Sequence, residues 1–261
     1  MTATATSPRT GARRTSVIPS AVRSQIDRGE LETRTLDESL SVDFAALMRA
    51  TFPQLARSTT TAMRADAAEG ITQQMATAGR LLFNHFGAAG YLRLARHRSD
   101  TVRGWAAYLL AASPDFSLGE RLQLTRPLAN DHNPGVRECA WLALRPQVAA
   151  NILLAIDLLE PWTVSTSPFL RRFAAEATRP RGVWSAHIDV LVRAPKLGLP
   201  ILEPLRADPH QYVQDSVANW LNDASYSHPE FVRELCGRWR EESPGPATER
   251  ICKRAQRSLD Q

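Results

Sequence analysis

The chain has 261 residues, of which 43% are hydrophobic and 23% charged, and its formal net charge at pH 7 is +5. This length is sufficient for one elongated domain with a buried core. No apolar run approaches the roughly 20 residues of a membrane span, and the N-terminus lacks the apolar core of a signal peptide. We therefore expect a cytoplasmic protein that has no membrane partner.

The cations of the chain are almost all arginine, because only Lys196 and Lys253 are lysines among the 32 basic residues. The planar fork of arginine binds phosphate groups bidentately. A GC-rich coding sequence would raise the arginine and alanine content together, whatever the function. Charge alone therefore permits a nucleic-acid partner without requiring one.

The three cysteines, Cys139, Cys236 and Cys252, are far apart and include no C-x-x-C pair. They predict free thiols in a reducing compartment, with neither a disulfide framework nor a zinc site. The six histidines are scattered, and the chain has no H-E-x-x-H motif, no glycine-rich phosphate loop and no G-x-S-x-G motif. We expect no metal and no cofactor.

The N-terminal third gives weaker signals than the rest of the chain. Residues 1–16 are small and polar and predict a disordered tail. Residues 17–53 predict two helices that end before Gly29 and Pro53. One or two further helices are expected over residues 59–86.

Four stretches farther along are variants of one nine-residue helical phrase: VRGWAAYLL, VRECAWLAL, LRRFAAEAT and VQDSVANWL. They begin at residues 102, 136, 170 and 213, so their spacings are 34, 34 and 43 residues. The first, fourth, fifth and eighth positions are apolar or small, which is the pattern of a helix with one face in a core. Such spacing is typical of stacked helical repeats, which form concave surfaces.

Asx and Ser-Pro turns precede three of the phrases, and partner helices are expected between them, over residues 118–128, 146–159 and 183–206. Another helix is expected over the segment HPEFVRELCGRWRE that follows Asp223. We predict one domain over residues 17–261, with capping helices at about 17–90, repeats at about 91–240 and a basic terminal helix at about 246–259.

The third, seventh and eleventh positions of the phrase follow an i, i+4, i+8 track that faces away from the core. Three successive phrases place polar residues on this track: Glu138, then Arg172 and Glu176, then Asp215, Asn219 and Asp223. We therefore expect carboxylates from three repeats to share one surface.

Two segments carry a specific resemblance, RRFAAEATRPRGVW over residues 171–184 and ADPHQYVQDSVANWLNDAS over residues 207–225. They resemble the AlkC/AlkD-type DNA alkylation repair proteins, HEAT-like-repeat glycosylases that excise cationic alkylated bases. The likeness is greatest to the AlkC branch, which carries similar E-x-T-R-P-R-x-x-W and V-A-N-x-L-N-D phrases. It extends from about residue 101 to 239 and is weak before about residue 90.

The resemblance implies an all-α, HEAT-like repeat solenoid whose concave face binds double-stranded DNA that contains alkylated bases, and a monomer is the default. In the family the lesion is not drawn into a pocket, unlike the usual base-flipping enzymes. Glu176 and Asp223 match the acidic residues and Trp184 the aromatic one, with Glu138 as a further candidate. The expected DNA contacts are Arg137, Arg171, Arg172, Arg179, Arg181, Asn219 and Asn222.

The implied chemistry needs few groups. An N3- or N7-alkylated purine is already cationic, so it leaves as a neutral base without a strong general acid. The sugar becomes cationic instead, and a carboxylate near C1′ would stabilise the oxocarbenium-like transition state and orient the attacking water. A tryptophan face attracts the same positive charge.

Each residue also has a purely structural interpretation. Glu176 is at ion-pair spacing from Arg172 and Arg179, Glu138 can pair with a neighbouring arginine, and Asp223 can cap a helix end. Trp184 can belong to the core. Two alternative functions remain open: a non-catalytic repeat scaffold that binds protein or DNA, and a specialised glycosylase for bulky alkyl adducts.

Overall fold

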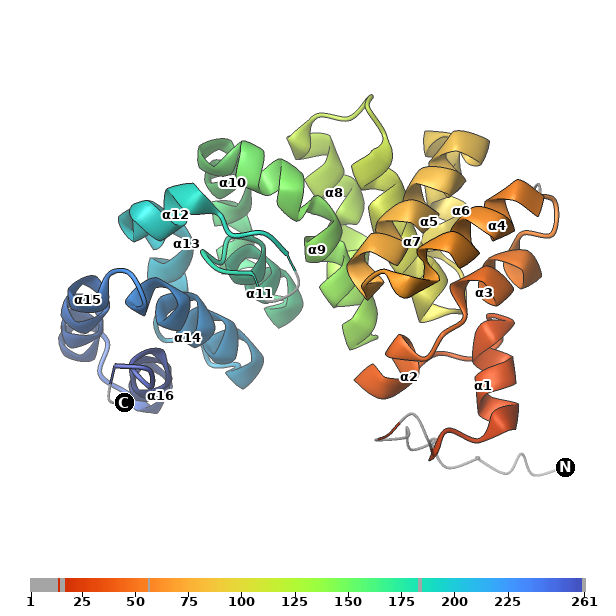
Figure 1. The fold of residues 1–261 in the computed structure, drawn as a ribbon. Coiled ribbons are helices and arrows are strands. Elements are labelled where there is room, and N and C mark those ends of the chain that lie inside the picture. Colours follow the sequence, from red (N-terminus) through yellow and green to blue (C-terminus); the bar gives the residue numbers. More distant parts are fainter. Residues whose placement is uncertain (1–13, 15–16, 56, 183–184, 260–261) are drawn as a thin grey trace, which may run out of the picture. The chain divides into compact units, whose positions relative to one another are not determined.

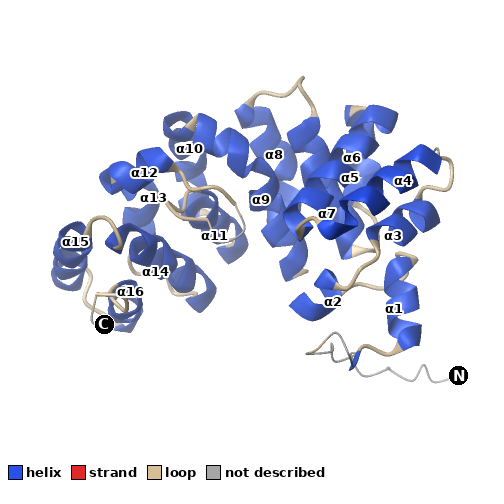
Figure 2. Cartoon of the chain, in the orientation of Figure 1, coloured by secondary structure: helices blue, strands red, loops and turns tan. Residues whose placement is uncertain are grey.

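The computed structural model describes residue 14 and residues 17–55, 57–182 and 185–259. These residues form sixteen α-helices with short 3-10 turns and contain no strand (Figures 1 and 2). The predicted all-α helical repeat class is confirmed. The predicted N-terminal tail lies, apart from Arg14, outside the described residues.

The contacts of the chain divide it into two compact units. Unit 1 contains residues 1–112 and 133–136, and unit 2 contains residues 113–132 and 137–261. The single repeat domain over residues 17–261 stays a prediction. All of the candidate site residues belong to unit 2.

Unit 1 is built on the packing of two long helices, α5 and α7. Gly79 of α5 lies directly against Tyr108 of α7, and Leu82 of α5 and Trp105 of α7 are inaccessible to solvent. The helices of this unit are α1 (Ser20–Asp27), α2 (Leu36–Leu40), α3 (Phe44–Thr51), α4 (Arg57–Ala65), α5 (Ile71–Phe86), α6 (Tyr91–Ala95) and α7 (Asp100–Ala112).

The second of the two helices predicted over residues 17–53 is wrong as a single helix, because α2 ends and α3 begins within it. Ser41 is the C-cap of α2. The side chain of Asp43 accepts a hydrogen bond from the Ala46 amide at 2.8 Å and caps the start of α3. A short acidic side chain binds free amides at a helix start better than it continues a helix. The helices expected over residues 59–86 are confirmed as α4 and α5.

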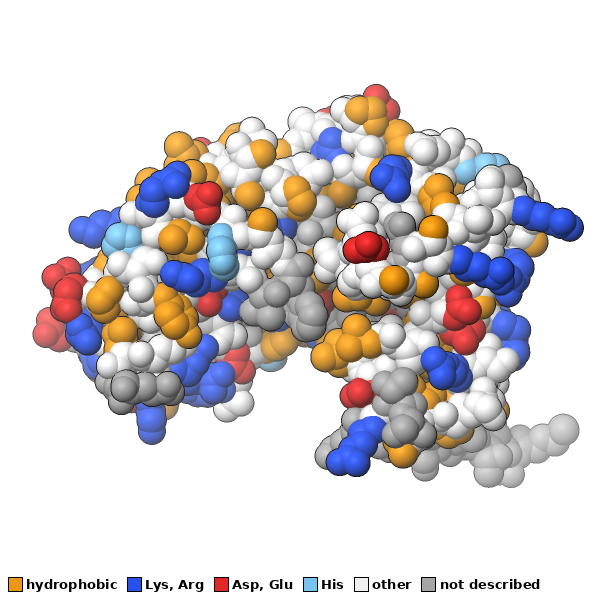
Figure 3. Space-filling model, in the orientation of Figure 1, with side chains coloured by type: hydrophobic (Ala, Val, Ile, Leu, Met, Phe, Trp, Pro, Cys, Tyr) orange, Lys and Arg blue, Asp and Glu red, His pale blue; other side chains and the backbone are white. Residues whose placement is uncertain are grey.

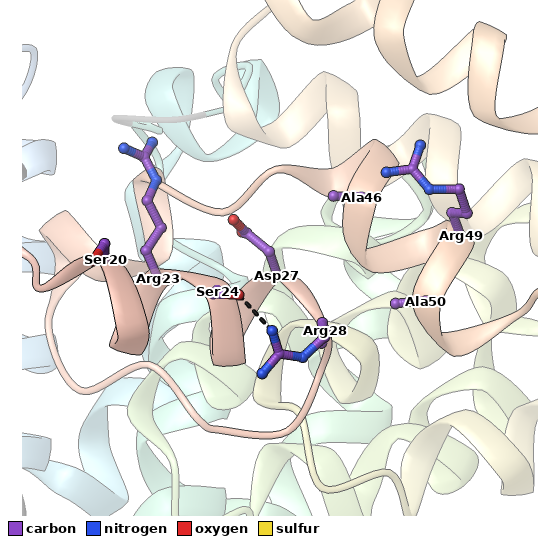
Figure 4. A pocket seen from close by; sticks show the side chains of 8 residues that line it. All are labelled: Ser20, Arg23, Ser24, Asp27, Arg28, Ala46, Arg49 and Ala50. Carbon is purple, nitrogen blue, oxygen red and sulfur yellow. Dashed lines mark hydrogen bonds between the residues drawn. The ribbon is translucent and has the colours of Figure 1, made fainter.

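A cavity of about 510 Å³ lies between α1 and α3. Figure 4 shows Arg28 at its edge donating to Ser24 one turn earlier on α1. Asp27 accepts a hydrogen bond from the Asp43 amide and so joins α1 to the start of α3. Burial raises the pKa of Asp27 above its ordinary value. None of the candidate site residues borders this cavity.

Unit 2 contains most of the repeats that carry the nine-residue phrase. The phrase residues Ala140, Ala174 and Val217 at the fifth position are completely buried, as the helical stripe predicts. Its helices are α8 (Leu118–Ala129), α9 (Pro134–Ala150, whose first three residues belong to unit 1), α10 (Ile152–Leu159), α11 (Pro168–Ala177), α12 (Asp189–Arg193), α13 (Leu199–Leu202), α14 (Gln211–Ser225), α15 (Pro229–Glu242) and α16 (Pro246–Ala255).

The partner helices were predicted with mixed success. Helices α8, α15 and α16 are confirmed close to their expected bounds. A helix that starts at Pro146 is wrong, since α9 continues through this proline to Ala150 and α10 begins at Ile152. The long helix expected over residues 183–206 is also wrong. Short helices and 3-10 turns replace it, because prolines recur there and cannot sustain a long helix.

No helix within the described part of the chain is long and apolar enough to cross a membrane. The three cysteines are free thiols, as expected. The described residues also contain no group of three or more side chains that could hold a metal ion.

The contact between α5 and α7 gives a test of the packing in unit 1. A Cβ atom on Gly79 of α5 would lie 2.5 Å from the backbone carbonyl carbon of Tyr108 in α7. We expect Gly79→Ala to lower the free energy of unfolding by about 1–3 kcal/mol, because the helices must move apart. Chemical denaturation measures this change.

Gly237 of α15 is the matched control, since a Cβ there meets nothing within 4 Å. Gly237→Ala should raise the free energy of unfolding by about 0.5–1 kcal/mol, because alanine favours a helix interior over glycine. Equal effects of the two substitutions would contradict the close approach of α5 and α7.

Candidate functional site

Three predicted carboxylates are joined through two arginines. Arg172 Nη2 lies 2.6 Å from Glu138 Oε1 and 3.5 Å from Glu176 Oε1. Arg179 Nη1 lies 3.2 Å from Glu176 Oε2, and its Nε lies 2.8 Å from Asp223 Oδ2. We call these five residues the carboxylate-arginine row. It crosses from α9 over α11 to α14, so the expectation that acids from three repeats share one side is confirmed.

The three carboxylates differ in burial and in partners. Glu176 is only 3% exposed, and Ser216 Oγ donates to its Oε1 at 2.6 Å. Glu138 is the most open, with 37% of its side chain exposed, and accepts from Trp141 Nε1 at 2.9 Å. Asp223 accepts two hydrogen bonds from Arg179, at 2.8 and 3.1 Å. The three carboxylates of the row therefore differ in how far they are buried from solvent.

Burial raises the pKa of Asp223 above its ordinary value of 3.8, and the hydrogen bonds and charge of Arg179 oppose this rise. For Arg179, burial and pairing shift the pKa in the opposite directions. Burial alone lowers the pKa of Arg179, but its bonds to Asp223 and the charge of Glu176 raise it overall. Charged pairing thus offsets the cost of enclosing these groups.

Arg145 of α9 is a site residue that sequence reasoning missed. It is 2% exposed and donates to the carbonyl oxygens of Ala177, Arg179 and Ala186 at 3.3, 2.7 and 3.2 Å. Its cation therefore lies at the C-terminal end of α11, where the helix dipole favours positive charge. Burial, and then the charge of Arg179, lower the pKa of Arg145 to about 10, so it stays charged at pH 7.

A cavity of about 200 Å³ borders the row in unit 2. Four members of the row line it, and Asp223 is joined to it through Arg179. Trp141, Arg145, Arg181, Gly182 and Asn219 complete the lining. Trp184, the predicted aromatic site residue, lies outside the described residues. Two other aromatic residues, both within the described part of the chain, lie beside the row: Trp141 lines the cavity and donates to Glu138, and the Tyr212 ring centroid is 4.2 Å from the guanidinium carbon of Arg172.

Two of the predicted DNA contacts, Arg137 and Arg171, bind backbone oxygens of the preceding turn, and a DNA-binding role for them stays a prediction. Arg137 Nη1 donates to the carbonyls of Asp131 and His132, and Arg171 Nη1 to those of Ser165 and Thr166. Arg103 makes the same pair of bonds to residues 97 and 98, and Gln214 makes one to residue 208. We call this repeated contact of the second phrase position the turn bracket.

The turn bracket explains why arginine recurs directly after the first phrase residue. Carbonyls in the turn before each repeat helix have no helical partner, and the long side chain supplies the donor. Arg171 also binds Asp208 of the next turn through two bonds, at 2.6 and 3.0 Å. Arg137 is buried, with its guanidinium carbon 4.1 Å from the Phe169 ring centroid. Arginine stands at the second position of three of the four phrases and Gln214 at that of the fourth, and this recurrence was the signal available in the sequence.

The other predicted DNA contacts lie at the α14 end of the row. Arg181 donates to the Asp223 carbonyl and to Ser227 Oγ, at 3.2 and 3.0 Å. Asn219 accepts a hydrogen bond from Arg257 at 3.0 Å. Asn222 is buried and bonds to Ser258 at 2.9 Å. A DNA-binding role for any of these residues stays a prediction.

Comparison with known proteins agrees with the resemblance of the two phrases. Residues 119–245 match the family of the DNA alkylation repair enzyme, a segment that includes the whole row. The uncharacterized protein YhaZ of Bacillus subtilis is 38% identical over 117 residues, which are 45% of this chain and 32% of YhaZ.

Solved structures show the same similarity. The alkylpurine DNA glycosylase AlkC of Pseudomonas fluorescens, bound to DNA with an abasic site analog, has a TM-score of 0.66 and 25% identity, over 90% of this chain and 63% of AlkC. AlkD2 of Streptococcus mutans has the same fold, with a TM-score of 0.56 and 19% identity over 84% of this chain and 98% of AlkD2. The chain thus spans under two thirds of AlkC and about a third of YhaZ.

The turn bracket and phosphate binding predict different results for Arg171→Met. The substitution leaves buried Asp208 without its cation and two carbonyls without their donor. We expect the free energy of unfolding to fall by about 3 kcal/mol. Urea denaturation of unit 2 measures this, for example through the fluorescence of its tryptophans.

Arg233→Met is the control, because Arg233 pairs with Glu230 on the exposed face of α15. It should change stability by less than about 0.5 kcal/mol. If Arg171→Met left stability intact and weakened only DNA binding, the phosphate role predicted from the sequence would replace the turn bracket.

Proposed function

We propose, because the chain resembles the AlkC/AlkD-type DNA alkylation repair proteins, that it is a monofunctional DNA glycosylase. Its substrates would be positively charged N-alkylated bases such as 3-methyladenine or 7-methylguanine in duplex DNA, excised without base flipping. It would act as a cytoplasmic monomer and need no cofactor. The observation that carries the proposal is the carboxylate-arginine row, in which acids from successive repeats meet beside one open cavity.

The charge of the row suits the proposed transition state. Three carboxylates face two arginines within the row, and Arg145 and Arg181 also line the cavity, so the stabilisation would come from the carboxylate charge nearest to the sugar and not from the net charge. Much of this charge lies out of water, where electrostatic interactions are stronger than in bulk solvent. An oxocarbenium ion at C1′ would be attracted, while the cationic base leaves as a neutral molecule. This supplies stabilisation mainly in the transition state, which is what raises a rate.

The carboxylates would divide the work according to their burial. Glu176 is bound by Ser216 and two arginines. Its negative charge would therefore act on the transition state from a distance, and it would hold the two arginines in place. Asp223 and Glu138 are less enclosed and have room to approach a sugar or to orient a water molecule. Trp184 would supply an aromatic face in the manner of the family, and its placement stays part of the proposal.

A non-catalytic repeat scaffold is the second candidate function. Every carboxylate of the row has an arginine partner, which is also the arrangement of a purely structural ion-pair network. The two candidates differ in what loss of a single negative charge does. A scaffold should keep its binding, whereas a glycosylase should lose its rate.

We expect Glu176→Gln and Asp223→Asn each to lower the rate of base release from methylated duplex DNA by about 100- to 1,000-fold. Amides keep the shape and most hydrogen bonds of the site but remove the charge that stabilises the transition state. Free 3-methyladenine and 7-methylguanine are measured under single-turnover conditions, with DNA affinity measured in parallel.

Glu230→Gln serves as a matched control, because it makes the same carboxylate-to-amide change on the exposed face of α15, outside the cavity. It should not produce the loss expected of Glu176→Gln and Asp223→Asn. Retained base release in both of these row variants would refute the catalytic role of the row. A wild-type protein that binds DNA and releases no alkylated base would favour the scaffold.

The raised pKa of Asp223 predicts an acid limit to the reaction. Because burial raises this pKa above 3.8, Asp223 becomes protonated at a higher pH than an ordinary aspartate as the solution is acidified. Its negative charge is then lost, so the rate of base release should fall as the pH drops through that pKa. Rates measured from about pH 4 to 8, corrected for spontaneous base loss, give the profile. If Asp223→Asn retained the same acid limb, another group would be titrating.

A further inference from the structure

Most arginines that the sequence suggested for DNA binding are already occupied. Arg172 and Arg179 belong to the carboxylate-arginine row, in which carboxylates outnumber arginines. Arg171 is bound to Asp208, and Arg137 is buried against Phe169. Three of these side chains are thus paired with carboxylates, and the fourth, Arg137, is buried and bound to two carbonyl oxygens. A duplex that approached the row would need cations from elsewhere.

The end of the row at α14 supplies such cations. Among the described residues, Arg181 and Arg257 have no carboxylate side-chain partner. Arg254 shares Asp215 with Arg250, so three arginines of this region face one acid on α14. Figure 3 shows Lys and Arg side chains gathered over the part of unit 2 where α14 and α16 lie. This surface therefore keeps a net positive charge.

These cations are joined to the candidate site by short contacts. Arg181 and Asn219 both line the cavity beside the row, and Arg257 donates to Asn219 at 3.0 Å. Helices α14 and α16 pack closely along their length (Figure 1). The pKa of Arg257 is lowered by burial and then by the charge of Arg254, while Asp223 opposes the shift. The positive surface thus begins where the row ends, at Asp223.

The side chain of Tyr226 contacts both Arg181 and Ser258, the residue that follows Arg257. It follows α14 directly and is 65% exposed, which is high for an aromatic side chain. The guanidinium carbon of Arg181 lies 5.1 Å from its ring centroid, and Ser258 Oγ lies 3.4 Å from its hydroxyl. The cation–π contact with this exposed ring can hold the Arg181 guanidinium in place for a phosphate.

We propose that Arg181, Tyr226, Arg254 and Arg257, which we call the cationic rim, form the surface that binds the phosphates of duplex DNA next to the lesion. Phosphate contacts set the position of a strand without reading its sequence. Held at the rim, one strand would present the adjacent sugar to Asp223 and the cavity. The inference rests on the proposed function where it places a lesion next to this surface, while the contact with DNA itself does not depend on catalysis.

The test is the salt dependence of binding to unmodified duplex DNA by the full chain, measured by fluorescence anisotropy. The double variant Arg254→Gln, Arg257→Gln removes two cations that point away from the buried face of α16, so the fold should persist. We expect the slope of log K against log salt concentration to become shallower by about 2. At about 0.1 M salt the affinity should fall on the order of tenfold or more.

Two matched proteins complete the experiment. The double variant Arg233→Gln, Arg238→Gln removes the same charge from exposed positions of α15 and should keep the wild-type slope. The variant Arg254→Lys, Arg257→Lys keeps the charge and should also keep the slope, even though its side-chain bonds to Asp215 and Asn219 change.

Three outcomes decide the matter. A shallower slope for the glutamine rim variant alone supports the cationic rim. Equal slopes for the rim and α15 variants overturn it, and leave the glycosylase proposal to be decided by base release. No measurable binding of DNA by the wild-type protein overturns the rim and the proposed function together.

Discussion

Burying a carboxylate is costly unless a cation comes with it, and the candidate site is organised around this constraint. Glu176 lies almost wholly out of solvent between two helices, and it does so in contact with Arg172, Arg179 and Ser216. Each arginine continues to a further acid on the next helix. The pairing that makes burial tolerable therefore also ties three repeats together, so the site and the helix packing depend on the same contacts.

The same constraint separates two tasks that a DNA enzyme must perform. The positive charge of an arginine that pairs with a buried carboxylate is largely neutralised by it, so this arginine attracts phosphate only weakly. Arginines beside Tyr226 and on α16 have fewer acidic partners and extend toward solvent. The carboxylates of the row and the arginines at its end would attract a cationic sugar and an anionic backbone to neighbouring places. A substitution in the row therefore need not alter phosphate binding at the rim, and a substitution at the rim need not alter the row.

The sequence predicted the helix faces well because those depend on local geometry. An i, i+4, i+8 spacing puts Asp215, Asn219 and Asp223 on one side of a helix whatever surrounds it. The partners of charged side chains depend instead on the offset between neighbouring helices. The recurring arginine at the second phrase position did not by itself identify Ser165 as the partner of Arg171, and nothing in the spacing placed Arg145 at the end of α11. The break at Asp43 was missed because a capping side chain competed with a continuous apolar pattern.

The positions of the phrase differ in how far their roles are fixed. Its first, fifth and eighth residues fill the core, and its second residue holds the preceding turn, in unit 1 through Arg103 and in unit 2 through Arg171. The third, seventh and eleventh residues have no fixed duty, since Tyr108 of the first phrase is buried against Gly79 of α5, whereas Glu138 of the second phrase is 37% exposed. In the first phrase this track carries Gly104 and Tyr108, whereas in later phrases it carries Glu138, Glu176 and Asp223. The carboxylates on this track also join neighbouring repeats through Arg172 and Arg179, so in unit 2 the site and the stacking of the repeats share these contacts.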